Sequence, residues 1–191
     1  MTPLAFLGHR LAPRHRAGGL VARFLRDESG SPAVEFALVA APFIALTLAL
    51  LQVGLIYFAQ EALETGTEET ARLVLTGQVS GQLNEASILG MLCPNMPSLF
   101  TCDAGHVMVD LQPTPSFNNA NVSKPTLTYD SNGNVNNTWT VNAGAPNDIM
   151  VMRVMYGWPV YLGPLGLNFG NMQNNRLLLM ATSVFKNEPP H

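Results

Sequence analysis

The chain has 191 residues, enough for one modest domain and a membrane segment, and only 12% of them are charged, against roughly 25% in an average soluble domain. Beyond Gly30 the sequence has five basic and eleven acidic side chains, which leaves six negative charges, so binding to nucleic acid is not expected. The sequence contains no serine-hydrolase, phosphate-loop, zinc-protease or dinucleotide-binding motif, and it implies neither enzyme activity nor a cofactor.

Residues 1–30 form a basic leader that is followed by a long apolar run. Half of the ten lysines and arginines lie in this leader: Arg10, Arg14, Arg16, Arg23 and Arg26. The 24 residues Phe36–Ala59 carry no charge. As a helix they would span roughly 36 Å at about 1.5 Å per residue, enough to cross a hydrocarbon core of about 30 Å. The sequence therefore predicts one transmembrane helix at about residues 36–59.

The charges on either side of the run set its expected orientation. Arginines precede it, and four glutamates follow it: Glu61, Glu64, Glu68 and Glu69. The positive-inside rule places the N-terminus in the cytoplasm and everything beyond residue 60 outside. A cleaved secretory signal is the alternative, but its apolar region would be shorter, about 7–15 residues, and would end at a small-residue cleavage site.

The apolar run is expected to continue into an amphipathic half, giving one helix over residues 31–76. Small and apolar residues recur there in steps of three and four: Ala59, Ala62, Leu63, Gly66, Thr70, Leu73, Val74 and Gly77. Small residues permit close approach of a sheet or another helix. Gly77 and Gly81 are expected to end the helix. Pro42, inside the apolar half, either bends the helix for subunit packing or is simply tolerated in a membrane.

The only two cysteines, Cys93 and Cys102, lie on the expected outer side, with prolines between them that favour a turn. In an oxidising compartment a disulfide is the natural interpretation, and two free buried thiols are the alternative. A metal site is not expected, because the four histidines are scattered and no C-x-x-C motif occurs. Asp103 and His106 near Cys102 form a catalytic triad only if that cysteine is free.

The remainder, residues 77–191, is expected to be an extracytoplasmic α+β domain. A short helix over Leu83–Leu92 precedes segments with strand-like alternation. The expected strands are His106–Leu111, Thr126–Tyr129, Thr138–Val141, Ile149–Tyr156 and Asn175–Phe185. Pro113–Lys124 and the aromatic segment Gly157–Asn174 are expected to be loops, and the second either contacts a partner or folds back on the core. The predicted fold class is α+β, with a long N-terminal helix packed on a small antiparallel sheet.

The stretch Glu28-Ser-Gly-Ser-Pro-Ala-Val-Glu-Phe-Ala-Leu-Val39 joins the leader to the apolar run. It resembles the prepilin signal of type IV pilins, in which a membrane peptidase cuts after the glycine and leaves glutamate as the fifth residue. A cut after Gly30 would make Ser31 the first residue and Glu35 the fifth. Pro32, two residues after this cut, departs from the usual pattern and could slow the peptidase.

Further segments narrow the resemblance. Four segments are similar to the corresponding parts of one family: the Glu35-Phe-Ala-Leu38 start, the Cys93 to Cys102 spacing before a strand, the Tyr156-Gly-Trp-Pro159 stretch and the Phe185-Lys-Asn-Glu-Pro189 ending. This is the TadE family of minor pilins, or pseudopilins, of the Tad (type IVc) pilus system. The resemblance covers most of residues 27–190 and leaves residues 1–26 unmatched. It implies a type IV pilin-like fold and no catalytic role.

The resemblance also implies how such a protein assembles. A prepilin peptidase would cut between Gly30 and Ser31, and Glu35, next to Phe36, would pair with the N-terminal ammonium of a neighbouring subunit. The expected partners are other minor pilins, the major pilin, the pilus assembly platform, the peptidase and membrane lipid. The expected location is the bacterial inner membrane with a periplasmic C-terminal domain, and the pilus after assembly.

Two alternatives to this hypothesis remain open from the sequence. Glu35 could be an interfacial charge on an ordinary anchor, with Gly30 as a plain helix-start residue. The protein would then be an uncleaved, single-pass anchored binding or scaffolding protein outside the cytoplasm. A membrane-tethered enzyme is the weakest alternative, since the sequence suggests no substrate.

Overall fold

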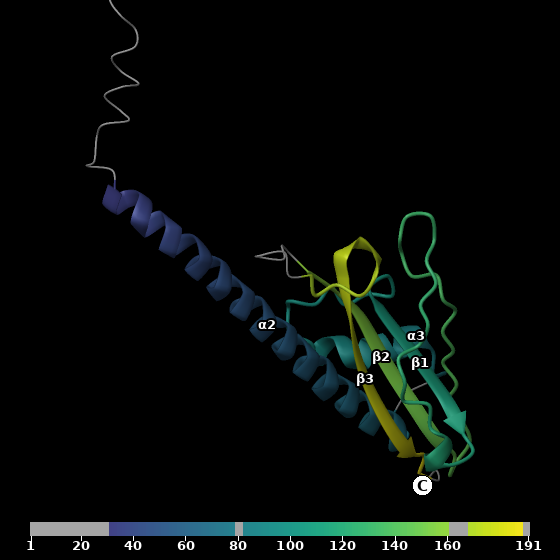
Figure 1. Cartoon of the computed structure of the whole chain (residues 1–191). Coiled ribbons are helices and arrows are strands. Elements are labelled where there is room, and N and C mark those ends of the chain that lie inside the picture. The colour runs from purple at the N-terminus through teal and green to yellow at the C-terminus, as the bar shows by residue number, and fades with distance from the viewer. Residues whose placement is uncertain (1–30, 79–81, 161–167, 189–191) are drawn as a thin grey trace, which may run out of the picture. The chain divides into compact units, whose positions relative to one another are not determined.

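This computed structural model describes residues 31–78, 82–160 and 168–188. Two helices, α2 (Ser31–Leu75) and α3 (Glu85–Leu92), are followed by strands β1 (Val107–Thr114), β2 (Ile149–Pro159) and β3 (Arg176–Lys186) (Figure 1). Short 3-10 turns lie at Cys93–Asn95, Phe117–Asn119 and Gln173–Asn175. The chain divides into two compact units, Met1–Phe43 and Ile44–His191, and the second contains the sheet. The predicted α+β class is confirmed.

The first half of α2 has an apolar surface that the rest of the chain leaves largely uncovered. Large apolar side chains are exposed on all sides of it, with Phe36 at 75% and Tyr57 at 73%. By length and composition this helix could cross a membrane, because an 18-residue stretch of it has a mean hydropathy of 2.3 and only 6% of that stretch is buried. Such a surface requires lipid or protein around it.

One face of α2 in the second unit is buried, and it begins earlier than the sequence indicated. The pattern predicts burial from Ala59 onward, whereas Ala49 is already 5% exposed and Ile56 packs against the core. The buried positions then follow at helical spacing: Ala59, Leu63, Gly66, Thr67, Thr70, Ala71 and Val74. Thr67 and Thr70 are accommodated because each hydroxyl donates to the carbonyl four residues earlier, Leu63 and Gly66.

Helix α2 and strand β3 run alongside each other in the same direction within the second unit (Figure 1). The Nε2 of Gln60 donates to the carbonyl of Met180 at 3.0 Å. Fifteen residues further along the helix, the Leu75 carbonyl accepts a 3.2 Å bond from the backbone N–H of Glu188. These two bonds fix the helix against the sheet edge near either end of the contact.

Helix α2 ends as its sequence predicts, at a glycine. Gly77 adopts a φ of +64°, which a residue with a side chain rarely adopts. The N–H of Gly77 bonds to the Val74 carbonyl and that of Gln78 to the Leu73 carbonyl, the pattern of a Schellman cap. Helix α3 begins two residues later than expected, because Asn84 caps it: its side chain accepts the Ser87 N–H at 2.9 Å, and the Ser87 hydroxyl accepts the Asn84 N–H.

The three strands form one antiparallel sheet in the order β1-β2-β3. Pairs such as Val109 with Val154, and Val154 with Ala181, set the register. Alternate residues therefore point to one face, where they join the buried stripe of α2 and the apolar side of α3 in a common core. The strand residues of this core are Val107, Val109, Leu111, Met150, Met152, Val154, Tyr156, Trp158, Leu179, Ala181 and Phe185.

The opposite face of the sheet is also covered, by the long connection between β1 and β2. Met155 is fully buried there and Leu178 is 6% exposed. The connection attaches to the sheet at Val141, which forms a bridge with Leu111, and at Thr140, whose N–H donates to Asp110 at 3.3 Å. The sheet is thus a middle layer between the helices and this connection.

A buried ion pair lies under that connection. Asp110 is 2% exposed and stands opposite Arg153 in the sheet register. The Nε of Arg153 donates to Oδ2 of Asp110 at 3.1 Å, its Nη2 contacts the same oxygen, and Gln112 Nε2 donates to Oδ1 at 2.7 Å. The carboxylate is therefore fully hydrogen-bonded, which is the condition under which burying a charge is tolerated.

The predicted strands at Thr126–Tyr129 and Thr138–Val141 are wrong. Each takes part only in a single bridge, Tyr129 with Val135 and Val141 with Leu111. In the first segment a side chain takes a backbone donor, since the Thr128 N–H donates to Oδ1 of Asn137 at 2.7 Å. In the turn that follows, the Asp130 carboxylate accepts the N–H groups of Asn132 and Asn134, both at 2.8 Å. The bond from the Asn134 N–H is the main reason why the pKa of Asp130 is lowered below its usual value.

The predicted loop at Gly157–Asn174 is wrong at its beginning, since β2 continues to Pro159. Trp158 is 8% exposed and lies in the core, where its ring is 5.5 Å from that of Phe100. Phe100 also meets Tyr156 edge-on at 4.9 Å. This aromatic cluster extends the strand, because three packed rings bury more apolar surface than a loop would. Tyr161, Leu165 and Leu167 lie outside the described residues.

The packing of α2 on the sheet predicts unequal effects of two leucine truncations. Leu63 is fully buried, so Leu63→Ala should lower the free energy of unfolding by about 2–5 kcal/mol. Leu55 lies on the same helix but is 49% exposed, and Leu55→Ala should have an effect within about 0.5 kcal/mol. Denaturant unfolding of the detergent-solubilised chain, followed by near-ultraviolet circular dichroism of its tryptophans, measures both. Equal losses would contradict this packing.

Candidate functional site

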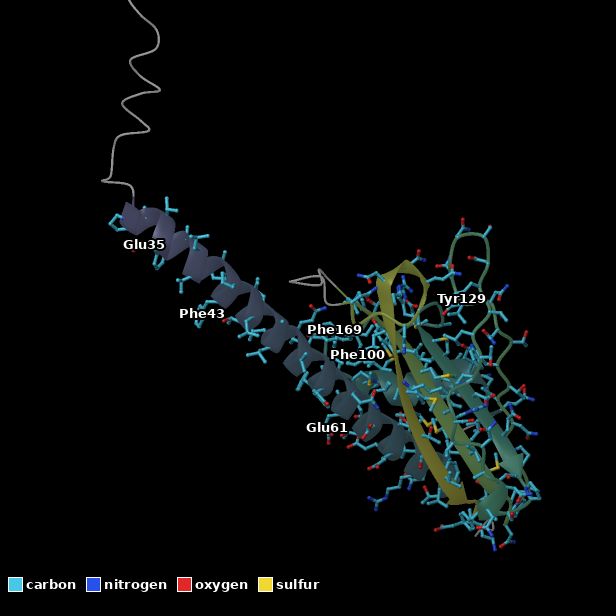
Figure 2. The ribbon with its side chains drawn as sticks, in the orientation of Figure 1. Glu35, Phe43, Glu61, Phe100, Tyr129 and Phe169 are labelled. Atoms are coloured by element: carbon cyan, nitrogen blue, oxygen red, sulfur yellow. A yellow bond between two sulfur atoms is a disulfide. The ribbon has the colours of Figure 1, made fainter. Side chains whose placement is uncertain are left out.

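The candidate site is the beginning of α2, where the sequence predicts processing and subunit pairing. Ser31 is the first helical residue, and Pro32 lies in the first turn, where a missing backbone N–H has no cost. Gly30 lies outside the described residues. Glu35 and its neighbours Val34 and Phe36 are exposed, and Figure 2 shows Glu35 near the start of the helix.

Along the helix, Glu35 follows Ser31 by four residues, or about one turn. Glu35 is the only ionisable side chain between Ser31 and Ala59 apart from the Tyr57 phenol. Its carboxylate therefore stands at the edge of a continuous apolar surface. A charge in such a position is favourable when an opposite charge is close, because the low dielectric strengthens the attraction and makes an unpaired charge costly.

Comparison with known families identifies this segment. Residues 30–72 match the family model of TadE-like proteins. The resemblance predicted from the sequence is therefore confirmed for the stretch that holds Gly30, Glu35 and most of α2. No curated protein and no solved structure matches the chain.

The TadE-like match ends at Arg72, before α3 and the three strands begin. It includes the candidate cleavage and pairing residues but not the cysteines, nor the stretches Tyr156–Pro159 and Phe185–Pro189 that also resemble the family. Together with the apolar helix, the match points to a membrane-anchored protein. The cleavage at Gly30 and the pairing of Glu35 and Phe36 remain predictions.

The predicted disulfide is present. Cys93, directly after α3, is joined to Cys102, with the two Cα atoms 5.7 Å apart. The bridge closes the turn that carries Phe100 into the core, where that ring packs between Tyr156 and Trp158. It therefore holds the connection between the helical layer and β1.

The disulfide also settles the question of a triad at this turn. Cys102 has no free thiol, and His106 Nδ1 is 2.7 Å from Oδ1 of Asp103. The hydrogen bond with His106 is the main cause of a lowered pKa at Asp103, and the N–H of Gly105 donates to the same oxygen at 2.8 Å. These contacts cap a tight turn before β1. Within the described ranges, no group of three or more histidine, cysteine, aspartate and glutamate side chains could hold a metal ion.

Removal of the disulfide should destabilise the packing of α3 on the sheet without unfolding the apolar half of α2. The double variant Cys93→Ser, Cys102→Ser should lose about 2–3 kcal/mol of unfolding free energy, because the bridge closes a short loop in the unfolded chain. Thermal unfolding of the purified protein with and without reductant measures the effect. Reductant should lower the stability of the unaltered chain to that of the variant and should leave the variant unchanged. Two titratable thiols before reduction would contradict the bridge.

Proposed function

We propose that this protein is a minor pilin, or pseudopilin, of a Tad-type pilus, cut after Gly30 by a prepilin peptidase and then incorporated during pilus assembly. The observation that carries the proposal is the TadE-like match over residues 30–72, which suggests a minor pilin related to the Tad pilus. Its first matched residue is Gly30, directly before the first helical residue Ser31. The proposed bond therefore lies at the boundary between the basic leader and the apolar helix.

The cut would create a positive charge with which Glu35 can pair. Hydrolysis of the Gly30–Ser31 peptide bond leaves an α-ammonium on Ser31, and a carboxylate attracts it strongly at the edge of hydrocarbon. The pairing partner in this proposal is the ammonium of a neighbouring subunit, which would fix the register of two staggered helices. Phe36, 75% exposed beside Glu35, would pack on that neighbouring helix. The ammonium of the same chain is also within one turn of Glu35, so the pair can form before assembly.

Topology and partners follow from the same proposal. The basic leader would stay in the cytoplasm and the domain beyond residue 60 would lie outside, in the periplasm before assembly. The partners would be other minor pilins, the major pilin and the assembly platform. An uncleaved anchored scaffolding protein would share the helix and the domain but would keep residues 1–30.

The intact mass of the protein tests the cleavage. Protein extracted from membranes of cells with an active prepilin peptidase should lack residues 1–30 and begin with Ser31. Protein from cells without the peptidase should keep all 191 residues. Retention of the leader in both strains would reject the pilin assignment and favour the scaffolding alternative.

Neutralising Glu35 tests the pairing separately from cleavage. Glu35→Gln keeps the size of the side chain and removes its charge, so piliation should fall to a small fraction of its normal level while membrane insertion, the disulfide and the outer domain persist. Glu61→Gln is the matched control, since Glu61 is an exposed glutamate of the same helix beyond the apolar run (Figure 2). Piliation is counted by electron microscopy. Equal piliation of the two variants would reject the role of Glu35.

A further inference from the structure

A groove with a volume of about 700 Å³ lies at the end of the sheet where β2 ends and β3 begins. This volume is within the range of about 300–1,000 Å³ that is usual for sites of small ligands. Charged, aromatic and small residues from five segments line it, among them Glu85, His106, Trp139, Gly157, Met172 and Arg176. Neither the TadE-like match nor the proposed cleavage involves any of these residues.

Arg176 is the cation of this groove. Its backbone is fixed, because its carbonyl accepts the N–H groups of Asn171 and Met172 at 3.0 and 2.9 Å. Its side chain lies across β2 at Gly157, where an added Cβ would stand 3.3 Å from the Cδ of Arg176. Within the described part of the chain, the guanidinium has neither an ion pair nor a hydrogen bond. A half-buried guanidinium without a partner favours an anion with oxygen atoms, above all a phosphate or a carboxylate.

Two further side chains limit the chemical class of ligand that the groove can bind. Glu85 lines the same groove, so a ligand with a large net negative charge would be repelled, while an ammonium group would be attracted. Trp139 is half-buried in the groove, and its indole can pack on apolar or cationic groups. The lining therefore suits a zwitterion with a phosphate at one end and an ammonium at the other.

The position of the groove indicates where such a ligand comes from. Within the second unit β3 runs in the direction of α2, and Met180 of β3 bonds to Gln60. The first strand residue, Arg176, therefore lies at the end of the sheet toward the apolar helix residues that precede Gln60 in this unit. The same end carries an exposed apolar side chain, Leu99 at 54%, next to Phe100, which packs on Tyr156 and Trp158. Arginine, tryptophan and exposed leucine at one end are typical of a surface that touches lipid headgroups.

We propose that this groove binds the headgroup of a zwitterionic phospholipid, with the phosphate on Arg176 and the ammonium toward Glu85 and Trp139. The bond to Arg176 is a charge-assisted hydrogen bond from the guanidinium to a phosphate oxygen. The bound lipid would hold the sheet end against the membrane beside α2. This contact does not depend on the cleavage after Gly30 or on pilus assembly.

Native mass spectrometry of the full chain in detergent, titrated with short-chain phosphatidylethanolamine, tests the site. The unaltered chain should retain one lipid specifically, and Arg176→Gln should weaken its binding roughly tenfold or more, as expected when a charge-assisted bond is lost. Arg72→Gln is the matched control, because Arg72 is an exposed arginine of the second unit outside the groove, and its binding should be unchanged. Equal binding by Arg176→Gln and the unaltered chain would overturn the proposal.

Titrations with two other ligands show whether the groove recognises a zwitterionic lipid, an anionic lipid or free phosphate. Short-chain phosphatidylglycerol, which lacks the ammonium, should bind more weakly than phosphatidylethanolamine, and Glu85→Gln should remove that difference. Inorganic phosphate at the same concentration should not displace the lipid. Preference for phosphatidylglycerol would overturn the zwitterionic assignment, and displacement by inorganic phosphate would overturn the lipid assignment.

Discussion

Helix α2 must be stable both in an apolar surrounding and against a folded domain, along one continuous run of residues. The rest of the structure depends on that constraint. Its apolar first half requires lipid or protein on all sides, whereas its second half buries one face in a folded domain. The two requirements overlap, because Ile56, inside the run that the sequence assigns to the membrane, already packs against the core. Over Ile56–Ala59 the helix is therefore covered on one face by its own domain and open on the other, where Tyr57 and Phe58 are exposed.

The domain that buries this helix face has a small apolar core. Its sheet has only three strands, yet both faces are buried, one by the helices and the other by the connection between β1 and β2. The disulfide fastens the turn between α3 and β1. The Asp110–Arg153 pair joins two strands, and further bonds from it reach Thr140 and Ser123 of the connection between them. Cross-links and buried polar bonds of this kind add stability where a core is small.

The sequence predicts the elements with strong periodicity and misses those that depend on tertiary contacts. The long helix, its end at Gly77, the disulfide and three strands could be read from spacing and composition. The extension of β2 through Trp158 could not, since glycine and proline around it indicate a loop and only the packing on Phe100 reverses that preference. The segment Thr126–Tyr129 is predicted as a strand from its sequence, but the N–H of Thr128 bonds to the side chain of Asn137 instead of to a neighbouring strand. At the candidate site, the sequence identifies Glu35 by its isolation in an apolar run, while the cation of the groove, Arg176, gives no signal before the fold places it beside Gly157.

The parallel course of α2 and β3 has a mechanical consequence. The Gln60 side chain bonds to Met180, and Leu75 accepts the N–H of Glu188, so the helix and the last strand are tied at two points along a shared direction. A pull along the helix axis would load both ties, and the packed surface between them, in shear. Bonds loaded together must break together, whereas bonds opened from one end break one at a time. The domain is therefore oriented to resist tension transmitted through its own anchor.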